Sequence, residues 1–388
     1  MSQNIRLHYL DNLRALAMLL GIVFHCALAY SPLMQNVWLT SDSQNSVIID
    51  VFAYCLHLFR MPLFFVVSGY FALMLIDKRT VSGFIKNRAK RILLPFIIFL
   101  PLLSIAMMLI ISWAINSIST TIPMLNYLVE EVSGSMQEMP INTMHLWFLL
   151  NLFFMCLMAA GLHKLKLFDA RWFKAFSSPL TILLLLPLLM TPALMYVSAP
   201  HPAPSKVYPE VWSFGFYGIY FLLGGALYKN RLLLQHLSQY KHYLLITGIV
   251  LYIVFYYQLP ASLSLLDMVR EANGVPFSWH HTRLAIVEAF AALYLTLVCI
   301  ILGQQYLSIE NKIFKYFMDS SYWLYLIHLP LLLMIQYYLI DLELNMWLKF
   351  AIGNLVVFTI GIASYQLLVR NTVIGVLLNG KRIEAMKK

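Results

Sequence analysis

Apolar stretches of about 20 residues recur along the whole chain, and they limit the folds open to it more than any other feature. A helix needs about 20 mostly apolar residues to cross the hydrocarbon core of a bilayer. Ten segments are candidates: 11–30, 51–75, 92–114, 145–162, 179–198, 212–228, 243–259, 283–303, 321–340 and 347–369. The sequence therefore predicts an all-α polytopic membrane protein, a bundle of about ten transmembrane helices with short sixth and seventh spans.

The composition agrees with a chain that exposes much of its surface to lipid. Of the 388 residues, 61% are hydrophobic and 11% are charged, whereas a soluble domain is about 25% charged. This excludes an ordinary soluble enzyme, a disordered chain and a disulfide scaffold. The first apolar segment is followed by no small-residue cleavage site, so we expect it to remain in the membrane.

Basic residues are concentrated in alternate connections between the predicted spans. One set of connections and the C-terminal tail hold 19 lysines and arginines, whereas the other set holds only Lys206 and Arg270. The positive-inside rule then predicts an even number of spans with both termini in the cytoplasm. It also accounts for the net charge of +10, so we expect no nucleic-acid partner. We predict one transmembrane domain, residues 1–375, and a short basic cytoplasmic tail, residues 376–388.

The first span holds three ionisable residues, Asp11, Arg14 and His25. Arg14 and His25 are eleven residues apart, about three helical turns, so both side chains share one helix face. Arg14 is predicted near the cytoplasmic mouth, with His25 about 16 Å farther into the bilayer. A purely structural interpretation is also open, in which Arg14 anchors the helix end and His25 bonds to a neighbouring helix.

The second span and the connection after it add further cations. His57 and Arg60 lie three residues apart on one helix face, and an arginine this deep must line a polar cavity or be paired. Arg88 and Arg91 are three apart at the start of the next helix, where guanidinium groups could bind a phosphate. Ordinary topology anchors would have the same spacing.

The later spans contain more polar candidates. His145 and Trp147 open the fourth span at its predicted outer mouth, and Glu288 in the eighth span could be a buried partner or a cavity carboxylate. In the ninth span, Ser321 and His328 share one face. Intramembrane ionisable residues usually mark function, and four histidines with two arginines are more than a structural assembly subunit needs.

Five of these strings, in this order, resemble the motifs of the acyltransferase-3 family of integral membrane acyltransferases. The first is a basic residue and a histidine separated by ten positions, Arg14 and His25. The other four are Met61-Pro-Leu-Phe-Phe-Val-Val-Ser-Gly69, Arg88-Ala-Lys-Arg91, His145-Leu-Trp147-Phe and Ser321-Tyr-Trp-Leu-Tyr325-Leu-Ile-His328. The resemblance covers nearly the whole chain. The strings around His25 and Arg60, and the ending Gly380-Lys381, are similar to members of the glucan-biosynthesis type, thought to succinylate periplasmic glucans.

The resemblance implies an enzyme of the bacterial inner membrane that moves an acetyl or succinyl group from cytoplasmic acyl-CoA to a hydroxyl of a periplasmic or cell-surface glycan. The residues themselves suggest no metal site, because the histidines lie on different predicted helices and the sequence has no His-Glu-x-x-His motif or cysteine pair. His25 and Arg14 are then the catalytic candidates, with His25 acting as general base or transient acyl carrier. The candidates for holding the donor are Arg14, Arg88, Arg91, Ser321 and Tyr325. The candidates for binding the acyl group and the acceptor are Asp11, His57, Arg60, His145, Trp147, Glu288 and His328.

A second class of protein fits the same residues. A proton-coupled transporter or exporter of a polar solute would also use many spans with intramembrane histidine and arginine. Such carriers often have a matched pair of spans, one in each half of the chain, that glycine or proline interrupts. This sequence contains no such pair. The oligomeric state is left open by the sequence.

Overall fold

The computed structural model describes residues 8–134, 142–171, 173, 178–271 and 274–380, and within them every regular element is helical. Eight apolar helical segments are long enough to span a membrane. They are His8–Leu28 (α1), Val47–Ile76 (α2), Val81–Ser117 (α3, Val81–Arg88, and α4, Leu94–Ser117), Met144–Lys164 (with α6, Trp147–Lys164), Val211–Lys229 (with α10, Ile219–Lys229), Trp279–Tyr306 (α14), Lys312–Ile340 (α15) and Met346–Val369 (with α16, Met346–Ser364). The predicted all-α polytopic fold is confirmed.

The seventh span is short, as predicted, but the sixth, Val211–Lys229, is long enough to span a membrane, and the fifth is the other short one. The fifth and seventh spans correspond to Thr181–Met195, which includes α8 (Leu186–Met195), and to Lys241–Tyr257 (α12). Short helices lie in the connections, namely α5 (Pro123–Gly134), α11 (Leu233–Ser238) and α13 (Leu265–Glu271), and a further short helix, α17 (Val373–Asn379), follows the last long one. The domain boundary predicted at residue 375 falls inside α17, so the described start of the predicted tail is helical. Residues 381–388 of that tail lie outside the described residues.

Polar caps fix where several long helices begin. The side chains of Ser46, Ser278, Asn311 and Asn345 each accept a hydrogen bond from a backbone N–H in the first turn of α2, α14, α15 and α16, respectively. These N–H groups have no partner within the helix, and a capping side chain satisfies one of them. The apolar runs therefore start at residues that the sequence marks.

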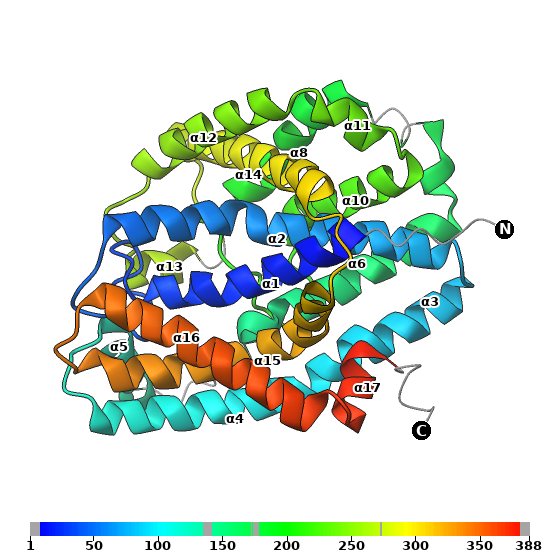
Figure 1. Ribbon diagram of the computed structural model, residues 1–388. Helices are drawn as coiled ribbons and strands as arrows, with labels where there is room; N and C mark the ends of the chain where they lie inside the picture. The colour runs from blue at the N-terminus through cyan, green and yellow to red at the C-terminus, as the bar shows by residue number, and fades with distance from the viewer. Residues whose placement is uncertain (1–7, 135–141, 172, 174–177, 272–273, 381–388) are drawn as a thin grey trace.

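The described chain begins, with α1, and finishes, with α17, at the same end of the bundle. In Figure 1, α1 begins towards the right and α3 and α17 lie at the right, whereas the α1–α2 and α15–α16 connections lie at the left. We call these the basic end and the distal end. The arrangement agrees with an even number of crossings, and the cytoplasmic location of the basic end stays a prediction.

Helices α2 and α10 are in backbone contact through two glycines. A Cβ added to Gly69 would lie 1.9 Å from the carbonyl oxygen of Phe221, and one added to Gly224 would lie 1.9 Å from that of Val66. Small residues allow this close approach of membrane helices. The contact holds the helix that carries His57 and Arg60 in place.

At the distal end, the connection between α1 and α2 is held by buried polar contacts. The Lys349 ammonium lies 2.8 Å from the Asp42 carboxylate and also donates to the carbonyl of Ile340. Thr40 donates to Gln336 of α15 at 2.7 Å. These contacts fix the loop that carries Trp38, whose indole stacks on the His25 ring with centroids 6.0 Å apart.

We expect Gly69→Ala to lower stability strongly, because the added methyl must push α2 away from α10. Overpacking of this kind costs about 3 kcal/mol, so the melting temperature of the purified protein in detergent should fall by several degrees. Gly161→Ala in α6 is the matched control, since nothing lies within 4 Å of its added Cβ. Equal melting of the two variants would contradict the backbone contact.

Candidate active site

Three cavities follow one another through the bundle. The basic cavity, about 460 Å³, lies at the basic end; a narrow middle cavity has about 50 Å³, and a distal cavity about 410 Å³. Met18, Phe64 and Phe148 line both the basic and the middle cavity. The residues shared by the middle and distal cavities are His25, Arg60, Met61 and Trp147. The three cavities thus adjoin one another through shared lining residues.

One face of α1 follows this line of cavities. Arg14 and Met18 line the basic cavity, and Met18, Gly21 and His25 line the middle one. Their spacing of four, three and four residues is that of a single helical face. Arg14 and His25 therefore face the same internal passage, as their spacing predicts.

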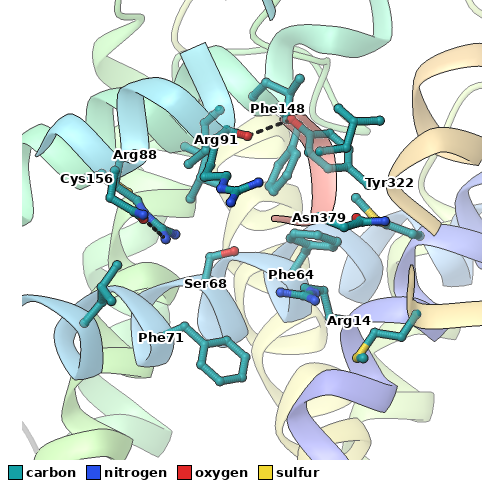
Figure 2. A pocket seen from close by; sticks show the side chains of 18 of the residues that line it. Arg14, Phe64, Ser68, Phe71, Arg88, Arg91, Phe148, Cys156, Tyr322 and Asn379 are labelled. Carbon is teal, nitrogen blue, oxygen red and sulfur yellow. Dashed lines mark hydrogen bonds between the residues drawn. The ribbon is translucent and has the colours of Figure 1, made fainter. Parts of the chain in front are cut away.

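The basic cavity carries a strong positive charge. Arg14, Arg79, Arg88 and Arg91 line it, and among its described lining residues Asp319 is the one carboxylate. Figure 2 shows the Arg14 and Arg88 guanidinium groups beside Ser68 and the rings of Phe64 and Phe71. Such a pocket suits a polyanion with a flat apolar part, because guanidinium groups bind phosphates and stack on planar groups.

Two residues predicted to hold the donor, Ser321 and Tyr325, do not line the basic cavity. Ser321 is buried and donates to the carbonyl of Met318, and Tyr325 lines the middle cavity. Tyr322 lines the basic cavity instead, and its hydroxyl donates to the Arg91 carbonyl at 3.1 Å. Successive side chains along a helix point about 100° apart, so Ser321 and its neighbour Tyr322 face different surroundings. Asp11, predicted on the acceptor side, lies at the basic end, 3.7 Å from Arg14.

A hydrogen bond between two histidines joins α1 to α15. His25 Nδ1 lies 2.9 Å from His328 Nε2, and His328 Nδ1 lies 2.6 Å from the Tyr325 carbonyl. Because a carbonyl only accepts, His328 Nδ1 must be the donor, and the Nε2 of the neutral ring is then the acceptor. His25 consequently donates through Nδ1 and keeps a lone pair on Nε2. This is the arrangement of a general base held in one tautomer by a second group.

A proline determines where His145 binds. Pro330 has no N–H, so the carbonyl of Leu326, four residues earlier, loses its partner within α15. His145 Nε2 donates to this carbonyl at 3.0 Å. The prediction placed His145 at the outer mouth; it is instead buried in the middle cavity, with its ring centroid 5.0 Å from that of His328.

Arg60 is a buried cation at the junction of the middle and distal cavities. Its residue surface is 6% exposed, and its guanidinium lies 4.4 Å from the centre of the Phe24 ring. Its Nε and Nη1 atoms have no hydrogen-bond partner among the described residues. Gly21 provides the space, because a Cβ there would lie 3.2 Å from Nη1. A buried charge normally requires a partner, so this site favours an anionic ligand.

On the distal side, His57 and His201 form a second histidine pair, and His201 is hydrogen-bonded to the buried carboxyl group of Glu288. His57 Nε2 donates to the His201 carbonyl at 2.9 Å, and His201 Nδ1 donates to Glu288 at 2.6 Å. The His201 backbone N–H also donates to Glu288, which is 1% exposed. Glu288 is therefore a buried partner. Sequence reasoning missed His201, whose one signal is a histidine between two prolines, Pro200 and Pro202.

The His201 ring is neutral at ordinary pH. It lies in the connection before α10, and burial lowers its pKa below the usual value near 6.5. The neutral ring of His201 supports the wall of the distal cavity through its hydrogen bond to Glu288. The backbone carbonyl of His201 fixes the orientation of the His57 ring.

We expect the stabilising effect of His201 to depend on pH. The unfolded chain binds a proton here below about pH 6.5, while the folded chain binds it only at a lower pH, because burial lowers the pKa of His201. The contribution is therefore fully present above about pH 6.5 and is lost as the pH falls. His201→Asn should lower the melting temperature by several degrees near pH 7, and the deficit should shrink towards pH 5. A deficit that is constant over this range would contradict the neutral ring.

These features define a multi-pass membrane protein with an internal polar passage between two cavities. The chain matches the family described as "Acyltransferase domain" over residues 7–366, and it belongs to this family. It is thus an acyltransferase of the membrane.

Bacterial relatives cover nearly the whole chain. "Glucans biosynthesis protein C" of Escherichia coli (strain SMS-3-5 / SECEC) is 24% identical, over 97% of this chain and 95% of the relative. The protein of the same name from Salmonella paratyphi B is 25% identical, with the same two coverages. No solved structure matches this chain.

Proposed function

We propose that this protein transfers an acetyl or succinyl group from cytoplasmic acyl-CoA to a hydroxyl of a periplasmic or cell-surface glycan in the bacterial inner membrane. Succinylation of a periplasmic glucan is the favoured case. The names of the relatives support the glucan, and the buried cation Arg60 supports the succinyl group. The line of three cavities, with arginines at one end and histidines at the other, carries the proposal.

The basic cavity is the proposed site of the CoA nucleotide. Arg14, Arg88 and Arg91 supply charge for its phosphates, and the neighbouring aromatic rings suit its base. The middle cavity, at about 50 Å³, is too narrow for the nucleotide. It suits the thin arm that carries the thioester, whose acyl end then reaches His25.

The distal cavity is the proposed site of the acceptor. This cavity lies at the opposite end of the line of cavities from the basic cavity, and Trp38, Trp147 and His57 are among its lining residues. Indole and imidazole rings offer both apolar faces and hydrogen-bonding edges to a sugar. An acceptor hydroxyl that enters from this side meets His25 where the two cavities join.

In the proposed reaction, Nε2 of His25 takes the proton of the acceptor hydroxyl as its oxygen attacks the thioester carbonyl carbon. The C–O bond forms, the C–S bond breaks, and the CoA thiolate leaves and takes the proton from His25. His328 keeps His25 in the required tautomer through the 2.9 Å hydrogen bond. A histidine suits this role because a neutral imidazole can accept a proton on one nitrogen and later release it.

We expect His25→Ala to abolish acyl transfer, with a loss of about 100-fold or more, because the general base is removed. His328→Ala should lose about tenfold, because it removes the group that orients the base. Membranes that contain the enzyme would be given labelled succinyl-CoA and glucan, and both thiol release and glucan labelling would be followed.

His242→Ala, at an exposed histidine of α12, is the matched control and should retain full activity. Full thiol release and labelling in His25→Ala would overturn the assignment of the base. A wild-type protein that never releases thiol would favour the transporter class.

Arg60 is the proposed partner of the succinyl carboxylate. We expect Arg60→Ala to reduce succinyl transfer about 100-fold and acetyl transfer less than tenfold, since only succinate brings a carboxylate to pair with the buried charge. Parallel assays with the two donors measure this ratio. The variant should remain folded, because the removed charge has no ion-pair partner among the described residues. Equal losses with both donors would show that Arg60 does not select the acyl group.

A further inference from the structure

The short helix α17 lies across the basic cavity. Leu378 and Asn379 line this cavity, and the Asn379 amide donates to the carbonyl of Asp319 in α15 at 2.7 Å. Figure 2 shows the Asn379 side chain in the same pocket as Arg91 and Tyr322. The end of the described chain is therefore part of the pocket wall.

Arg91 binds the last turn of this helix. Its Nη1 atom donates to the carbonyls of Val376 and Leu377 at 2.8 and 2.9 Å. A cation beside the last turn of a helix is favoured by the helix dipole, and the Val376 carbonyl also accepts from the backbone N–H of Gly380 at 3.1 Å. The side chain of Arg91 is thus fixed by α17 rather than free to move.

Gly380 keeps the space beside the same guanidinium open. Its φ of +93° favours glycine, and a Cβ at this position would lie 2.6 Å from Arg91 Nη2. Any side chain here would displace the guanidinium and occupy the space that an oxygen bound to Nη2 needs. Since Nη1 is used by α17, Nε and Nη2 form the edge that can meet a phosphate with two hydrogen bonds.

We propose that α17 and Gly380 position Arg91 for the phosphates of the donor, which makes this C-terminal corner part of the donor-binding site. The inference rests on the proposed function, because it takes the basic cavity as the CoA site. Binding is reciprocal by linkage: if the docked helix strengthens the donor contact, the bound donor stabilises the docked helix by the same factor.

The test uses the purified full-length protein with coenzyme A as the probe and calorimetry as the readout. Gly380→Ala should weaken CoA binding about tenfold, the size expected for one charge-assisted hydrogen bond. Gly161→Ala is the matched control, since its methyl meets nothing within 4 Å, and it should bind CoA as the wild type does.

A double-mutant cycle separates positioning from a general effect. In an Arg91→Ala background, Gly380→Ala should change CoA affinity less than twofold, because the group through which it acts is absent. As a second readout, saturating CoA should slow amide hydrogen exchange in Val373–Asn379 of the wild type, and slow it less in Gly380→Ala.

The outcomes distinguish the two proposals. A wild-type protein that does not bind CoA would overturn the proposed donor. CoA binding that is equally strong in the wild type and in Gly380→Ala would overturn the role of the C-terminal corner and leave the donor intact. An equal effect of Gly380→Ala with and without Arg91 would show that the corner does not act through Arg91.

Discussion

A buried guanidinium, that of Arg60, which has no ion-pair partner among the residues that the structure describes, is the constraint around which the centre of this bundle is arranged. Burial of an arginine deep in an apolar bundle is costly, and Arg60 offsets part of that cost through the face of Phe24 at 4.4 Å. Gly21 leaves the room that the guanidinium occupies. The cavities on either side of Arg60 meet at this charge. An anion that entered from either cavity would meet a cation whose desolvation cost the fold has already met.

Backbone carbonyls give the neighbouring histidines their direction. Tyr325, Leu326 and His201 each accept a hydrogen bond from one imidazole N–H, so in each neutral ring the second nitrogen is the acceptor. At Leu326 the carbonyl is available because Pro330 cannot donate to it. The tautomers are thus set by main-chain geometry, which is less adaptable than side-chain partners and keeps His25 Nε2 as the basic atom.

The sequence predicted what depends on local periodicity and charge. Apolar length gave the long spans, and the eleven-residue spacing placed Arg14 and His25 on the face that lines the passage. Ser321 and Tyr325 were assigned to the donor by motif resemblance, but the rotation of α15 puts Tyr322 in the basic cavity instead. His201 and Trp38 lie in connections, and their partners, Glu288 and His25, are brought to them only by tertiary packing. No periodicity along the chain encodes such pairs.

In the proposed reaction, the narrow middle cavity would let one passage serve both sides of a membrane. Phe64 and Phe148 line its junction with the basic cavity, and Trp147 its junction with the distal cavity. Rings at these positions limit continuous water between the two larger cavities, and exclusion of water protects a thioester from hydrolysis. If the donor arm fills the middle cavity, the two substrates meet only at His25. Each substrate then blocks the route of the other, so acyl transfer needs no opening of the bundle from one face to the other.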